Sequence, residues 1–118
     1  MTLQDIVDQL NLTLLTGPKD LSQIVPTGGY TSDLLGCVMA GAQHGGIWVT
    51  LQAHVNVVAV AALLDLSAVI ITESAMPDPE AIEKASEEGV ILFSSSEPTF
   101  YVVGKLWEMG LRAVTCRG

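Results

Sequence analysis

Residues 47–74, IWVTLQAHVNVVAVAALLDLSAVIITES, decide the fold of this chain. They predict a buried strand over 46–51, a polar turn, an almost wholly apolar helix over 55–64 and a second strand over 67–72. Both strands are continuous apolar runs, which is typical of strands that are buried on both faces of a parallel sheet. The stretch therefore predicts one strand–helix–strand unit of such a sheet.

The rest of the chain continues this alternation in both directions. Further helices are predicted over 3–10, over 31–42 with Thr31 or Ser32 as the cap, from Pro79 to a stop at Gly89, and from a cap at 94–98 to Gly110. Further strands are predicted over 12–15, 21–25, 90–93 and 111–114. We expect a single α/β domain over residues 1–118, with a mainly parallel sheet flanked by helices on both faces.

Apolar residues make up 49% of the 118 residues, only 15% are charged, and the mean hydropathy is +0.46. So small a monomer has too much surface to hide that much apolar material, which predicts a homodimer. A tight monomer with many buried alanines and valines is the alternative. Gly28 and Gly29 predict a turn, and small residues in the next helix allow close packing. The candidate turn or interface residues are Gly28, Gly29, Tyr30, Ser32, Asp33, Gly36 and Ala40.

The charge pattern disfavours two classes of partner, and the sequence shows no targeting signal. The chain has 13 acidic and 5 scattered basic residues, a formal charge of −8, which disfavours binding to nucleic acids and to anionic membranes. The acidic start, Met1–Asp8, is not a secretory signal, and the longest apolar run, Val57–Leu64, is too short to span a bilayer. Cys37, expected in the core, and Cys116 suggest no disulfide framework. We expect a reduced, cytoplasmic protein.

Polar side chains gather in turns that follow three of the predicted strands. In a parallel sheet these turns share the edge at the strand C-termini, where ligands of open α/β sheets bind. Each turn also precedes a helix N-terminus, which favours an anion or a hydrogen-bonding oxygen. The candidate ligand-binding residues are Gln52, His54, Asn56, Thr72, Glu73, Ser74, Ser94 and Ser95, with Ser96 beside them.

A purely structural interpretation competes at each of these positions. Helix capping alone would explain Asn56, Asp78 and the serines. Gln52 and His54 are not needed as caps, although a loop histidine can simply be a surface residue. His44, just before a glycine pair, is expected to meet the dipole at a helix C-terminus.

Catalytic motifs are missing from the sequence. It contains no phosphate-binding loop with its lysine and no Gly-x-Ser-x-Gly elbow. Two histidines and two separated cysteines do not make a metal site, so no metal or cofactor is expected. His54 and Glu73 would form an acid–base pair if their turns are neighbours.

Three segments resemble the small stand-alone members of the DRTGG domain family: 28–35 (GGYTSDLL), 48–61 (WVTLQAHVNVVAVA) and 70–72 (IIT). The family has an Asp-Arg pair after one strand and Thr-Gly-Gly after the next. Here these positions read Ala53-His54 and Thr72-Glu73-Ser74, so that only Thr72 keeps the name motif. Glu73 in place of a glycine makes that turn acidic and less welcoming to phosphate.

The resemblance implies an accessory α/β domain, of the kind fused to CBS-domain pyrophosphatases and phosphotransacetylases, with homodimer contact as one of its roles. Such chains are also similar to the N-terminal domain of HPr kinase/phosphorylase. We therefore expect a non-catalytic regulatory or interaction domain that senses a small metabolite or nucleotide at the strand C-terminal edge or contacts a partner protein. The alternatives are a small enzyme with His54 as general base and a purely structural dimerisation module.

Overall fold

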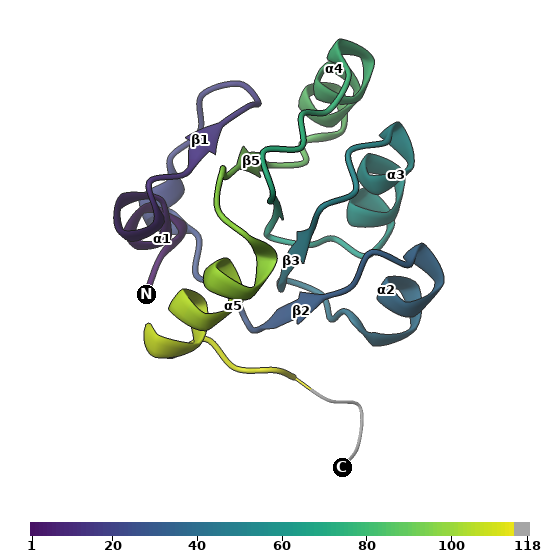
Figure 1. Cartoon of the computed structure of the whole chain (residues 1–118). Helices are drawn as coiled ribbons and strands as arrows, with labels where there is room; N and C mark the ends of the chain where they lie inside the picture. Colours follow the sequence, from purple (N-terminus) through teal and green to yellow (C-terminus); the bar gives the residue numbers. More distant parts are fainter. Residues whose placement is uncertain (115–118) are drawn as a thin grey trace.

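The computed structural model describes residues 1–114 and contains one five-stranded sheet with the strand order β1-β5-β4-β3-β2 (Figure 1). The strands are β1 (Thr13–Leu14), β2 (Gly29–Thr31), β3 (Ile47–Thr50), β4 (Ala68–Ile71) and β5 (Leu92–Ser94). Strands β2 to β5 are parallel to their neighbours, and only β1 pairs antiparallel, with β5. The expected mainly parallel sheet is confirmed.

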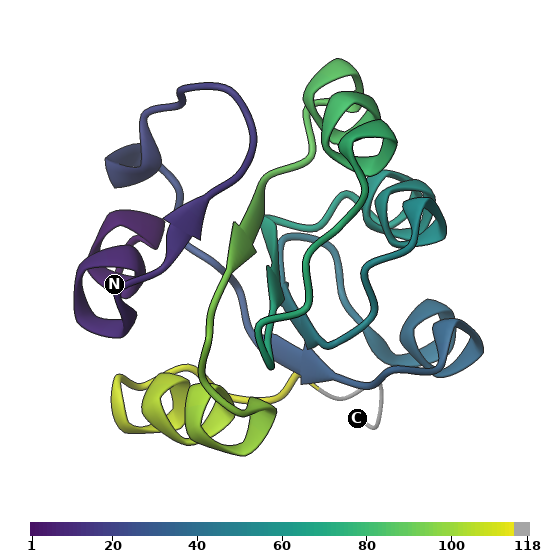
Figure 2. The same cartoon turned by 45° about the horizontal axis from the view of Figure 1, so that its top comes forward.

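The helices cover both faces of this sheet, also as expected. They are α1 (Leu3–Leu10), the short 3₁₀ helix η1 (Leu21–Gln23), α2 (Leu35–Gly41), α3 (Val55–Leu63), α4 (Pro79–Glu88) and α5 (Thr99–Glu108). Helices α2, α3 and α4 lie on one face, whereas α1 and α5 lie on the other (Figures 1 and 2). The parallel strands follow one another in space, so right-handed crossovers place α2, α3 and α4 on the same face. After β5 the chain returns to the face of α1, where α5 lies.

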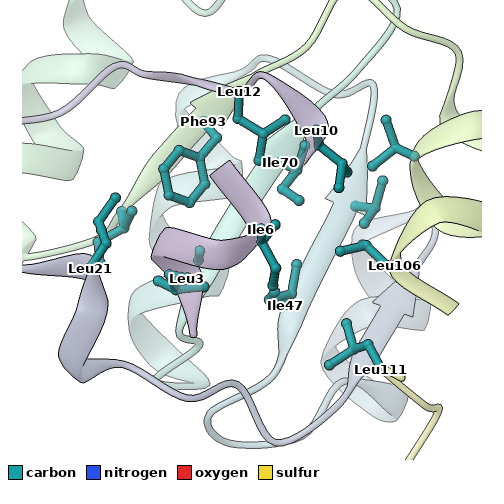
Figure 3. Close-up of a cluster of buried hydrophobic side chains, with 14 residues drawn as sticks. Leu3, Ile6, Leu10, Leu12, Leu21, Ile47, Ile70, Phe93, Leu106 and Leu111 are labelled. Carbon is teal, nitrogen blue, oxygen red and sulfur yellow. The ribbon is translucent and has the colours of Figure 1, made fainter. Parts of the chain in front are cut away.

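Each face of the sheet carries its own hydrophobic core, because successive strand residues point to opposite sides. Ile47 of β3 packs into the core beneath α1 and α5 (Figure 3). Val49 packs into the same core, while Trp48 packs into the core beneath α2, α3 and α4. All residues of β3 and β4 are buried. This two-sided burial explains why both strands are continuous apolar runs in the sequence. Within residues 1–114, no helix is long and apolar enough to cross a membrane.

The strand expected over 21–25 is wrong. Residues Leu21–Gln23 form η1 instead, and its start is fixed by Asp20. The Asp20 carboxylate accepts hydrogen bonds from the Ser22 backbone N–H at 3.1 Å and from the Ser22 hydroxyl at 2.5 Å. Such local side-chain bonds favour a turn over an extended chain.

The turn expected at the glycine pair is also wrong, because Gly29 is the first residue of β2 and neither glycine has a positive φ. Instead, the two glycines let the backbone of the segment 111–114 come close to β2, because they have no side chain. A Cβ on Gly28 would lie 2.9 Å from the carbonyl oxygen of Arg112, and the Gly29 N–H donates to that same oxygen at 3.0 Å. The segment 111–114, expected as a last strand, contributes one parallel bridge there, between Ala113 and Gly29.

Three smaller expectations fail around α2. The helix begins only at Leu35, and neither Thr31 nor Ser32 is its N-cap residue. It ends at Gly41, so His44 lies beyond its last turn and pairs with exposed Asp65 at 3.2 Å instead. Cys37 is exposed on α2 and is not a core residue. Cys116 lies outside the described residues.

Candidate functional site

The turns that follow β3, β4 and β5 lie at one edge of the sheet, as parallel pairing of these strands requires. In the first turn, His54 is the N-cap residue of α3, and its Nδ1 accepts a hydrogen bond from the Asn56 N–H at 3.1 Å. The interpretation that His54 is not needed as a cap is therefore wrong. Asn56, which capping alone would have explained, lies within the first turn of α3 instead.

Asp33 joins this first turn to the segment that follows β2. Its Oδ1 accepts hydrogen bonds from the Thr50 hydroxyl at 2.8 Å and from the Leu51 N–H at 2.9 Å. The Gln52 amide donates to the Asp33 carbonyl oxygen at 3.1 Å. Thr50 is fully buried, so Asp33 satisfies a hydroxyl group that water does not reach. Asp33 and Gln52 thus act as connectors between two loops.

The second turn has an unusual backbone at Glu73 and Ser74. Glu73 has φ +62° and Ser74 has φ +59°, in the left-handed region, and the Ala75 N–H donates back to the Thr72 carbonyl oxygen at 3.0 Å. L-residues other than glycine adopt this conformation at a cost of about 1 kcal/mol each. Two successive residues of this turn thus hold a left-handed backbone although neither is glycine.

The Glu73 side chain joins this turn to α5. Its Oε2 accepts a hydrogen bond at 2.8 Å from the N–H of Thr99, the first residue of α5. Beside it, the hydroxyl groups of buried Thr72 and of Thr99 are 2.5 Å apart. The N-terminus of α5, which would favour a bound anion, therefore already holds a carboxylate of the chain itself.

A polar cavity lies where the second and third turns meet. The chain leaves β4 towards α4 on one face and leaves β5 towards α5 on the other, so the connections diverge between these strands. Such a switch point is the usual ligand crevice of an open α/β sheet. The cavity of about 230 Å³ is lined by Asn11, Thr13, Ser74, Ala75, Met76, Ser94, Ser95 and Ser96.

This cavity brings together only part of the predicted site. It includes the candidates Ser74, Ser94 and Ser95, while Gln52, His54 and Asn56 do not line it. Sequence reasoning missed Asn11 and Thr13, which reach the cavity because β1 pairs with β5 so that Thr13 lies opposite Ser94. No local sequence pattern predicts this pairing, because β1 and β5 lie far apart in the chain.

The other candidate residues do not form a common site either. Within the part of the chain that the structure describes, no hydrogen bond joins His54 to Glu73, since each is bonded elsewhere. No cluster of His, Cys, Asp or Glu side chains that could hold a metal ion is found in residues 1–114. On α2, a Cβ on Gly41 would lie 2.5 Å from the ring of Tyr30, whose hydroxyl donates to the Cys37 carbonyl at 3.1 Å. Gly36 and Ala40 remain exposed.

No family model matches the sequence, and a search of curated proteins finds no match. The structure is similar to that of the CBS and DRTGG domains of the regulatory region of Clostridium perfringens pyrophosphatase, solved with its activator diadenosine tetraphosphate. The TM-score is 0.75 at 17% sequence identity, over 98% of this chain and 51% of that one. The chain thus spans about half the length of the solved protein. This similarity confirms the expected DRTGG-like fold.

Proposed function

We propose that this chain is a regulatory or interaction domain that works as a homodimer and binds a small metabolite or nucleotide without transforming it. The observation that carries the proposal is the polar cavity at the switch point between β4 and β5. Its lining offers hydroxyl and amide groups, and none of the described residues that line it is charged. At about 230 Å³ it is smaller than the roughly 300–1,000 Å³ of ordinary ligand pockets. It suits one neutral, hydroxyl-rich part of a ligand, such as a ribose.

The acidic turn beside the cavity supports a neutral contact of this kind. Glu73 already occupies the N-terminus of α5, so a phosphate group placed there would meet a like charge. A nucleotide would therefore bind through its sugar or base, with its phosphates directed towards solvent.

The hydrogen bonds made by side chains at the strand C-terminal edge support ligand recognition over catalysis. Three titratable side chains at this edge, those of Asp33, His54 and Glu73, accept hydrogen bonds from backbone N–H groups. Each is thereby tied to holding a loop or a helix end in place. A general base would instead need its acceptor atom directed at a substrate proton.

The fold similarity supports a regulatory role. The Clostridium perfringens regulatory region, of which this chain matches 51% in fold, was solved with a nucleotide activator. An accessory domain of this fold would transmit ligand binding to a partner through its contacts and would need no catalytic group.

The composition of α3 supports the homodimer. Its sequence VNVVAVAAL is apolar nearly all round, and Leu63 at its end is 68% exposed. The neighbouring helix α2 exposes Met39, and Leu34 just before it is 69% exposed. A helix that is apolar on every side is normally covered, so a second copy would pack on α2 and α3.

Thermal-shift measurements with adenosine, AMP, ATP and diadenosine tetraphosphate test the ligand proposal. We expect one of these nucleotides to raise Tm in a saturable way. The rise should be lost in the Thr13→Val, Ser94→Ala double variant, which removes two hydroxyls from the lining. Ser86→Ala on the exposed side of α4 is the matched control and should keep it. Absence of any shift, or an unchanged shift in the double variant, would count against the cavity.

Sedimentation velocity at micromolar concentrations tests the homodimer. The wild type should sediment as a dimer, and Leu63→Glu on α3 should give monomers because it places a charge in the proposed interface. Val25→Glu is the control, since Val25 is 63% exposed in a loop outside α2 and α3. A monomeric wild type would remove the homodimer from the proposal.

A further inference from the structure

A second cavity, independent of the polar one, lies on the opposite side of the sheet from α2, α3 and α4. This groove of about 200 Å³ runs between α5, the edge strand β2 and the segment that follows α5. Leu106 and Leu111, both part of the core beneath α1 and α5 (Figure 3), form part of the wall of the groove. Val49 and Val103 also line it, so the groove is predominantly apolar.

Among the described residues 1–114, Arg112 is the only charged one in the lining of this groove. Its Nη1 donates hydrogen bonds to the carbonyl oxygens of Trp107 at 2.7 Å and of Leu111 at 3.2 Å. Its Cζ lies 4.2 Å from the centre of the Trp107 ring, which is cation–π distance. These contacts hold the guanidinium in a defined position. A guanidinium has five N–H donors in a rigid fork, so donors other than those on Nη1 can bind a ligand.

Unlike Lys84 and Lys105, Arg112 has no acidic partner among the residues that the structure describes. Lys84 and Lys105 pair with Glu88 and Glu108, at 3.3 and 3.6 Å. No ion pair involves Arg112 within the described residues 1–114, although the chain carries 13 acidic side chains. A fixed and unneutralised cation beside an apolar groove is complementary to a ligand that combines hydrocarbon with a negative charge.

We propose that this groove binds a small apolar carboxylate. The hydrocarbon part lies against Val49, Val103 and Leu106, and the carboxylate accepts hydrogen bonds from the Arg112 guanidinium. A single negative charge fits better than a phosphate dianion, because the Trp107 carbonyl belongs to the C-terminal end of α5, whose dipole is negative. The volume of about 200 Å³ limits the ligand to one ring or a short chain.

The two tryptophans make the groove directly observable. Trp107 lines it and is 54% exposed, whereas Trp48 is fully buried in the core beneath α2, α3 and α4. Octanoate and cyclohexanecarboxylate serve as probes, with octanamide as the neutral counterpart of octanoate. In ¹H–¹⁵N spectra, octanoate should shift the indole N–H signal of Trp107 saturably and leave that of Trp48 in place. Octanamide should bind at least about tenfold more weakly, because it cannot make the charged hydrogen bonds.

Matched variants separate the groove from general charge effects. Arg112→Gln should weaken octanoate binding about tenfold or more, since it removes the charged donors. Lys105→Gln removes one positive charge from α5 at a residue outside the groove, and should change affinity less than twofold. Val103→Trp should abolish binding by filling the groove. Circular dichroism and thermal unfolding of each variant establish that it is folded.

Three results would overturn the proposal: equal binding of octanoate and octanamide, equal loss in Arg112→Gln and Lys105→Gln, or no ligand-dependent shift of the Trp107 signal. A Trp107 signal that moves with protein concentration alone would also overturn it, because a second copy would then cover the groove. The Thr13→Val, Ser94→Ala variant should bind octanoate like the wild type. Failure of the nucleotide cavity and failure of this groove are therefore distinguishable.

Discussion

The Glu73 carboxylate accepts a hydrogen bond at 2.8 Å from the backbone N–H of Thr99, the first residue of α5. This contact ties the turn after β4 to the helix after β5, across the point where the chain changes face. It also satisfies one of the N–H groups that a helix start leaves without a partner. The edge of the sheet is therefore provided with an anion of its own, which favours neutral ligand groups in the adjacent cavity.

Two glycine substitutions separate the backbone of this turn from the Glu73 contact. Ser74→Gly should raise the free energy of unfolding by up to about 1 kcal/mol, because it removes a left-handed non-glycine residue. Glu73→Gly also removes a left-handed non-glycine residue, but it loses the hydrogen bond to the Thr99 N–H, which is worth about 1 kcal/mol. Urea denaturation should thus find Ser74→Gly the more stable of the two. Equal stabilities would show that the carboxylate contributes nothing.

Substitution of Asp33 should destabilise the edge of the sheet. Asp33→Ala leaves the buried Thr50 hydroxyl and the Leu51 N–H without their acceptor, at a cost of about 1–3 kcal/mol. Asp33→Asn keeps an oxygen acceptor in the same place and should cost less. The comparison is made by urea denaturation, and a larger loss for the asparagine variant would contradict this account.

Two substitutions of His54 distinguish its capping role from the alternative of a general base. His54→Ala removes the side-chain acceptor at the N-cap of α3 and should cost about 0.5–2 kcal/mol in stability. His54→Ser restores a good cap without an imidazole, so its thermal unfolding should stay close to that of the wild type. If a substrate is found and its turnover is lost in the stable His54→Ser variant, the enzyme alternative is supported instead.

Two alanine substitutions test the role of the glycine pair before β2. Gly28→Ala should destabilise the chain and disturb the groove, since its Cβ would lie 2.5 Å from Cγ2 of Val114 and 2.9 Å from the Arg112 carbonyl. The control is Gly104→Ala inside α5, whose Cβ would meet no atom within 4 Å in residues 1–114. It should stabilise the helix by up to about 1 kcal/mol. Thermal unfolding shows whether each substitution raises or lowers Tm. A rise in Tm for Gly28→Ala would contradict the packing argument.

The sequence predicts best where the deciding interactions are local. The apolar runs at 46–51 and 67–72 give β3 and β4 because strands buried on both faces need apolar residues at every position. Thr2 and Asp5 form the capping box of α1 as their spacing predicts. The prediction fails at 21–25, where the side chain of Asp20 bonds within its own segment and starts η1. Apolar content alone does not reveal this competition.

The candidate site shows the same division between local and distant causes. The sequence determined by itself that polar turns share one edge, because parallel strands place their C-termini together. Only the tertiary structure decided that Ser74 and Ser94 share a cavity with Thr13, while Asp33, Gln52 and His54 hold neighbouring loops. The same holds for Gly28, whose missing side chain admits the segment 111–114. Such contacts join residues far apart in the chain, and their side chains carry no local pattern that specifies the partner.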